Sequence, residues 1–152
     1  MQIIDLLSPE RVRLGVRARS RKRLLELASD LLAEDDVDAR AIYSSLCSRE
    51  RIGSTGLGHG VAIPHGRLGA AETARGAFLM LNDGIDFDAP DNAPVDLVFA
   101  LVVPEHHHEE HLQLLAQLAG LFSSDERRTE LRDATSGAAV MELLEAAGHS
   151  LV

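Results

Sequence analysis

The chain has 152 residues, of which 45% are apolar and 26% charged, the composition of a globular protein with one domain-sized core. Its 24 acidic side chains outnumber the 15 basic ones, and the net charge of −9 disfavours binding to nucleic acid or to anionic membranes. A single cysteine, Cys47, excludes an internal disulfide, no apolar run reaches the length of a membrane span, and residues 1–5 lack the features of a secretion signal. We therefore expect a cytoplasmic protein with one domain, residues 1–152, and no insertion into the membrane.

Hydrophobic periodicity predicts helices before and after a cluster of strands. In chain order we expect a helical turn at 3–7, a strand at 12–16, a helix capped by Ser20 and running to 32, a helix from Asp38 to about 51, strands at 60–63, 77–81 and 95–103, and helices at 107–122, 125–132 and 137–147. The strand at 95–103 is almost continuously apolar, which is typical of a central strand covered on both faces. The pattern indicates an α/β fold with a sheet sandwiched between helical layers.

The most informative segment of the chain is residues 58–67, which present one histidine, His65, between Pro64 and Gly66. We expect the apolar residues 61–63 to form a buried strand that the proline ends. The glycine leaves room for another backbone or for a phosphate to approach. A histidine held at a strand end and accessible to a visitor suits an imidazole that acts as a nucleophile toward phosphorus.

The glycine-rich segment at 53–58 precedes this strand. It lacks the lysine of a nucleotide-binding P-loop, because His59 stands at that position, and it does not follow the dinucleotide-binding pattern. One interpretation is a plain tight turn. The other is an anion-binding concavity lined by backbone N–H groups and by the hydroxyls of Ser54 and Thr55.

Arg49 lies near the end of the helix that precedes the glycine-rich segment. An arginine there interacts favourably with the helix dipole, which is sufficient reason for its presence. Because the guanidinium group is planar and permanently charged, Arg49 is equally suited to bind phosphate oxygens.

A second group of histidines occupies residues 105–111, with the sequence EHHHEEH. His107 and His111 lie one helical turn apart and match a short zinc-binding signature, so a zinc-dependent hydrolase is an alternative function. No third ligand is evident, and His106, His107 and His108 are also typical of a solvated loop at a helix start. His111 differs, because it leads directly into the apolar series of the following helix.

Three stretches carry a resemblance to a known family: RERIGSTGLGHGVAIPHGR at 49–67, PVDLVFALVVP at 94–104 and HLQLLA at 111–116. They resemble the fructose/mannitol-type IIA components of the bacterial phosphoenolpyruvate phosphotransferase system (PTS), and most closely the nitrogen-regulatory branch of that family. Position 59, more usually asparagine in this stretch, is His59 here, which could alter local protonation or offer a rival phosphorylation site.

The resemblance implies the PTS IIA type-2 fold, a three-layer α/β/α sandwich around a mixed sheet, and the function of a phosphocarrier. His65 matches the phosphorylated histidine, His111 the second active-site histidine and Arg49 the active-site arginine of the family. The phosphoryl donor would be a small phosphohistidine carrier protein of the HPr type, and no cofactor or metal would be needed. We expect a phosphate cradle to complete the site, formed by Ser54, Thr55, Gly56 and Gly66.

The resemblance leaves the downstream role open. A IIA unit either passes its phosphate to a sugar-specific IIB component or regulates target proteins according to its phosphorylation state. No IIB or membrane domain accompanies the family stretches in this sequence, and together with the closer resemblance this favours the regulatory branch. A regulator whose histidine no longer cycles is a third interpretation, and the presence of Arg49, His65 and His111 together argues against it.

Overall fold

The computed structural model describes residues 2–35, 37–69, 71–106 and 108–150. In these ranges two 3₁₀ turns at Ile3–Leu6 and Pro9–Arg11 precede six strands and five α-helices. The strands are β1 (Val12–Val16), β2 (Gly56–Gly58), β3 (Val61–Ala62), β4 (His65–Leu68), β5 (Arg75–Ile85) and β6 (Val95–Pro104). The helices are α1 (Arg21–Leu32), α2 (Ala39–Ile52), α3 (His108–Phe122), α4 (Asp125–Asp133) and α5 (Gly137–Ser150).

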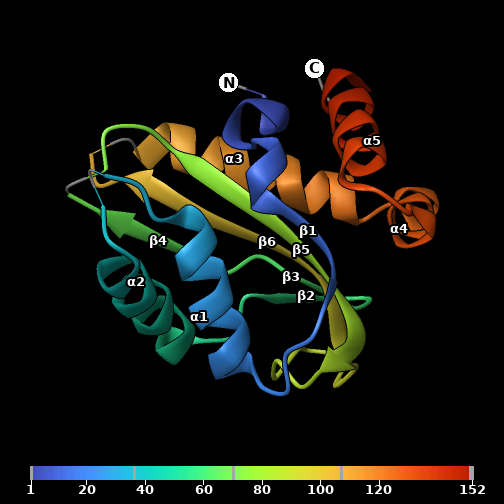
Figure 1. Ribbon diagram of the computed structural model, residues 1–152, viewed down its shortest axis with the longest axis horizontal. Coiled ribbons are helices and arrows are strands. Elements are labelled where there is room, and N and C mark those ends of the chain that lie inside the picture. The colour runs from blue at the N-terminus through green and yellow to red at the C-terminus, as the bar shows by residue number, and fades with distance from the viewer. Residues whose placement is uncertain (1, 36, 70, 107, 151–152) are drawn as a thin grey trace.

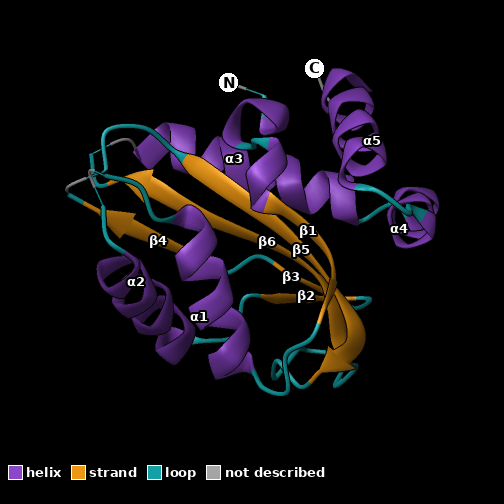
Figure 2. Cartoon of the chain, viewed as in Figure 1, coloured by secondary structure: helices purple, strands orange, loops and turns teal. Residues whose placement is uncertain are grey.

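All six strands form one mixed sheet (Figure 2). Its order is β1-β5-β6-β3-β2. β4 pairs with β6 as well, further along that strand than β3 does. β5 and β6 run antiparallel, whereas β3 and β4 run parallel to β6. The strand predicted at 95–103 is therefore the central strand β6.

The central strand divides the core into two apolar layers, because its side chains alternate between the faces of the sheet. On the face covered by α3, α5 and the N-terminal turns lie Leu97, Phe99, Leu101 and Val103. On the face covered by α1 and α2 lie Val98, Ala100 and Val102. Figure 1 shows these helices on opposite sides of the sheet, which confirms the predicted three-layer α/β/α architecture.

The helices begin where the sequence predicts. The hydroxyl of Ser20 accepts the N–H of Arg23, and the carboxylate of Asp38 accepts the N–H of Ala41, so both residues are N-caps. Within the described ranges, no helix combines the length and the apolar character that spanning a bilayer requires.

The segment around the candidate histidine differs from expectation in two respects. Pro64 interrupts the edge of the sheet but does not end it: β3 stops at Ala62, and β4 begins at His65 and pairs with the same strand. The carbonyl of Pro64 still accepts the N–H of Leu101 at 2.9 Å. Part of the expected glycine turn is also a short strand, β2, antiparallel to β3. His65 is thus the first residue of an edge strand.

Gly66 is required by close packing between β4 and α2. A Cβ atom at this position would come within 2.9 Å of Ser45 Cβ and still closer to Ser45 Oγ. We expect Gly66→Ala to destabilise the fold by about 1–3 kcal/mol, because the helix or the strand must shift. In a double-mutant cycle measured by urea unfolding, Ser45→Gly should recover part of this loss, since it removes the two side-chain atoms that the new Cβ would contact. Strictly additive effects would contradict this explanation.

His59 has a left-handed backbone, with φ of 56°, between two glycines that also have positive φ. Its N–H donates to the carboxylate of Asp91 and its carbonyl accepts from the guanidinium of Arg132, so both contacts use backbone groups that any non-proline residue at this position would keep. Because asparagine tolerates this conformation best among non-glycine residues, His59→Asn should stabilise the protein by about 0.5–1 kcal/mol. His59→Val should destabilise it by about 1–2 kcal/mol, because branched side chains are disfavoured there. Urea unfolding would measure the stability of both variants, and the opposite order of stability would refute the argument.

Candidate functional site

His65 is half-buried at the start of β4, on the face of the sheet that α3 covers. Its register partner in β6 is Leu101, which belongs to the core layer on that face. The ring Nδ1 lies 2.8 Å from the carbonyl oxygen of Ile63. Because a carbonyl only accepts, Nδ1 carries the proton of the neutral ring and Nε2 carries the free electron pair. The ring nitrogen available for nucleophilic attack is therefore Nε2.

His111 comes from the first turn of α3 and is buried, with 4% of its surface exposed. Its ring lies edge-on to that of His65, with centroids 5.3 Å apart and an interplanar angle of 75°. Its Nδ1 accepts a hydrogen bond from Nε of Arg67 at 3.2 Å. Its Nε2 is buried and has no hydrogen-bond partner among the described residues.

Both histidines are held in the neutral form near pH 7. Burial lowers the pKa of His65 below its usual value of 6.5, the hydrogen bond to Ile63 opposes this, and the charges of Arg49 and Arg67 lower it further. Burial, followed by the neighbouring charges of His65, Arg67 and His108, lowers the pKa of His111 to about 4. A neutral imidazole is the form that can attack phosphorus.

Arg49 lies in the last turn of α2, where its Nη1 donates to the carbonyl of Gly53 at 2.7 Å. This contact is the favourable helix-end interaction that the sequence allows. The same guanidinium lies close enough to His65 to lower its pKa. Arg49 therefore places a positive charge beside the candidate nucleophile while it is anchored to the end of the helix.

The structure assigns internal hydrogen bonds to the polar groups of the predicted phosphate cradle. The hydroxyl of Ser54 donates to the carbonyl of Phe87 and accepts the N–H of Gly56. The hydroxyl and the N–H of Thr55 both donate to the buried carboxylate of Glu50. Gly66 packs on α2, as described above. A cradle built from these residues stays a prediction, and any phosphate contact would compete with these bonds.

The sequence interpretation missed two residues that shape this site. Arg67 contacts His111, and its signal was its position two residues after His65, which places both on one face of a strand. The expectation that Pro64 ended the strand concealed this alternation. Glu50 is 8% exposed and organises the glycine-rich segment through Thr55, and burial raises the pKa of its carboxyl group. No feature of the sequence separates Glu50 from a solvated helix residue.

The described residues give no support to the zinc alternative. Among the described residues, no group of three or more His, Cys, Asp or Glu side chains is arranged to hold a metal ion. His107, one of the two residues of the zinc signature, lies outside the described residues.

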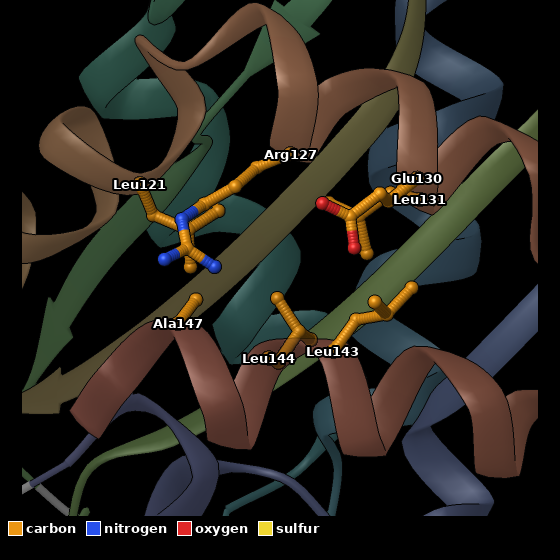
Figure 3. Close-up of a pocket in the computed structure, with 7 residues that line it drawn as sticks. All are labelled: Leu121, Arg127, Glu130, Leu131, Leu143, Leu144 and Ala147. Atoms are coloured by element: carbon orange, nitrogen blue, oxygen red, sulfur yellow. The ribbon is translucent and has the colours of Figure 1, made fainter. Parts of the chain in front are cut away.

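Figure 3 shows a pocket between α3, α4 and α5 that Leu121, Leu131 and Leu144 help to line, and no candidate site residue borders it.

The lowered pKa of His111 predicts a pH-dependent stability. The unfolded chain binds a proton at His111 as the pH falls below about 6.5, whereas the folded protein does so only near pH 4. The fold should therefore lose up to roughly 3 kcal/mol between these pH values through this group. Denaturant unfolding from pH 7 to pH 4.5 should show a shallower decline for His111→Gln, which cannot titrate there. Parallel curves for the variant and the wild type would contradict the assignment.

The sequence and the fold of this chain are similar to those of known proteins. Residues 5–147 match the family described as phosphoenolpyruvate-dependent sugar phosphotransferase system, EIIA 2. The nitrogen regulatory protein of Pseudomonas aeruginosa is 41% identical over 146 residues, which are 95% of each chain. The crystal structure of the nitrogen regulatory protein IIA-Ntr from Neisseria meningitidis superposes with a TM-score of 0.91 at 41% identity, covering 93% of this chain and 98% of that one. The mannitol IIA structure from Escherichia coli, at 24% identity, shares the fold with a TM-score of 0.77 over 91% of this chain and 98% of that one.

The chain belongs to the EIIA type-2 family of the phosphoenolpyruvate-dependent phosphotransferase system. Within that family its relatives confirm the resemblance to the nitrogen-regulatory IIA proteins, since both the Pseudomonas protein and the Neisseria structure carry that description.

Proposed function

We propose that this protein is a phosphocarrier that receives a phosphoryl group on Nε2 of His65 from the phosphohistidine of an HPr-like carrier protein. The observation that carries the proposal is the hydrogen bond from Nδ1 of His65 to the carbonyl of Ile63. It leaves Nε2 unprotonated, in a ring whose lowered pKa keeps it neutral.

In the transfer, a bond forms between phosphorus and Nε2 of His65 as the bond between phosphorus and the donor's imidazole nitrogen breaks. The donor's nitrogen keeps the electron pair of the broken bond. His65 keeps its Nδ1 proton, so the phosphorylated ring becomes cationic and its hydrogen bond to Ile63 becomes charge-assisted. Little beyond positioning and charge stabilisation is required, because the transition state of phosphoryl transfer is loose.

Two neighbours supply that stabilisation. The Nε2–H of His111 is buried beside His65 and is available to donate to a phosphoryl oxygen. Arg49 brings a permanent positive charge close to the same ring. Ser54, Thr55, Gly56 and Gly66 stay a proposed cradle whose contribution requires their present bonds to loosen.

Three exposed apolar side chains lie close in sequence to residues of the candidate site, and they support docking of a protein donor there. Ile52 is 84% exposed and follows Arg49 by three residues, and Leu112 is 62% exposed and directly follows His111. Leu57, in the glycine-rich segment, is 42% exposed. Such side chains, which gain by being covered, fit a partner that places its phosphohistidine over His65.

The proposal extends to regulation of target proteins according to the phosphorylation state of His65. The similarity to proteins described as nitrogen regulatory supports this role over transfer to a sugar-specific IIB component. The IIB alternative is supported by another relative, a fructose-specific EIIA component of Haloferax volcanii with 38% identity over 121 residues, which are 80% of this chain.

The direct test is incubation of the protein with phosphoenolpyruvate, enzyme I and an HPr-like carrier, followed by intact mass measurement before and after mild acid. We expect one added phosphoryl group that mild acid removes. An unchanged mass in every condition would reject the phosphocarrier and favour a regulator that acts by binding alone.

A further inference from the structure

Arg67 contacts His111 from the strand that carries His65, and the proposed transfer step does not yet give it a role. It follows His65 by two residues in β4, so the two side chains lie on the same face of the strand. Their register partners in β6, Leu101 and Val103, both belong to the core layer beneath α3. Arg67 therefore reaches His111 from the strand that also carries the nucleophile.

The direction of the contact fixes the state of the His111 ring. A guanidinium group only donates, so the 3.2 Å contact from Nε of Arg67 makes Nδ1 of His111 the acceptor. An accepting Nδ1 in a neutral ring requires that the proton is on Nε2. We propose that Arg67 is a positioning residue, which holds His111 in its Nε2–H tautomer so that this ring can donate to the phosphoryl group. This inference rests on the function proposed above.

The burial of His111 supports this role. Its Nε2–H has no partner among the described residues, although buried donors are nearly always partnered. The ring stands edge-on at 5.3 Å from His65, where the phosphoryl group would arrive. An oxygen of that group would supply the missing acceptor, but only for the tautomer that Arg67 selects.

The charge of Arg67 acts in the same direction as its hydrogen bond. It opposes protonation of His111 together with His65 from β4 and His108 from α3 itself. A doubly protonated ring could not accept from Arg67 and would lose its orientation. The arginine thus excludes both the other tautomer and the imidazolium form.

Two variants with side chains of matched length separate the effect of the Arg67 hydrogen bond from the effect of its charge. Arg67→Gln places an amide N–H at the same distance along the side chain as Nε and removes the charge. Arg67→Met places a methyl group there and removes both. Arg40→Met, at the opposite end of α2 from Arg49, is exposed and controls for the change in net charge.

The experiment measures the ring ¹⁵N chemical shifts of His111 in the unphosphorylated full chain across a pH series, assigned with His111→Gln. We expect the wild type and Arg40→Met to show a single Nε2–H tautomer. Arg67→Met should show shifts averaged between the two tautomers and a higher pKa for His111. Arg67→Gln should restore the tautomer but not the lowered pKa.

Phosphorylation kinetics complete the test. We expect Arg67→Met to slow transfer from the carrier by about tenfold or more with an unchanged KM for the carrier, and Arg67→Gln to recover most of the rate. An unchanged His111 tautomer in Arg67→Met would overturn the proposal, even if transfer slowed, since Arg67 would then act on the phosphoryl group directly. The tautomer is observed without any transfer, so a wild-type protein that is never phosphorylated would reject the proposed function independently of this result.

Discussion

His65→Ala should abolish phosphorylation by the carrier protein. The variant lacks the imidazole whose Nε2 is left unprotonated by the hydrogen bond to Ile63. Of the other histidines whose side chains the structure describes, His111 has its proton on the nitrogen that faces no partner, and His59, His106 and His108 are exposed. Intact mass after incubation with phosphoenolpyruvate, enzyme I and carrier should show no added phosphoryl group.

The matched control is His106→Ala, which removes an exposed histidine and should be phosphorylated at the wild-type rate. Phosphorylation of His65→Ala at the normal rate would refute the assignment of His65. Residual phosphorylation that disappears on adding His59→Asn would instead identify His59 as a rival site.

His111→Ala should leave a folded protein that accepts the phosphoryl group about 10²–10³-fold more slowly. This is the typical cost of removing one preorganised donor to a developing negative charge. The donor here is the buried Nε2–H beside His65. Rapid-quench kinetics with phosphorylated carrier would measure the rate, and circular dichroism would establish that the fold is intact.

His111→Gln separates the donor from the ring, because glutamine retains an amide N–H. We expect this variant to be phosphorylated faster than His111→Ala and more slowly than the wild type. A rate for His111→Ala within about twofold of the wild type would exclude a role in stabilising charge during transfer.

The layers of the fold followed from the sequence because its periodic signals are strong. The strand at Val12–Val16 and the helices capped by Ser20 and Asp38 lie where the pattern predicts them. The nearly continuous apolar run at 95–103 also correctly predicted a central strand, β6, that is covered on both faces.

The expectation that a strand ends at Pro64 is confirmed for β3, which stops at Ala62, but it missed that pairing with β6 resumes at His65. Proline cannot donate a hydrogen bond, but its carbonyl can accept one, and at the sheet edge that suffices to continue the pairing with β6. The strand that was not expected, β4, is the one that places His65 and Arg67 on the same face of the sheet.

The hydrogen bonds of the glycine-rich segment could not be predicted from local pattern. The hydroxyl of Ser54 donates to Phe87, which lies far along the chain and near this segment only in the folded protein. Glu50 looks like a solvated helix residue in the sequence, and only the folded structure shows that it is buried and accepts hydrogen bonds from Thr55. The proposed roles of His65, His111 and Arg49 come from family resemblance, and the structure adds hydrogen bonds that select one neutral tautomer for each of the two histidines.

The measurement that tests the central claim most directly is ¹⁵N and ³¹P NMR of the phosphorylated, ¹⁵N-labelled protein. It identifies both the residue and the ring nitrogen that carry phosphorus. We expect one phosphohistidine, at His65, with phosphorus bonded to Nε2 and the proton still on Nδ1. Phosphorus on Nδ1 of His65, or on any other residue, would contradict the account, because the hydrogen bond to Ile63 would then not select the nucleophile.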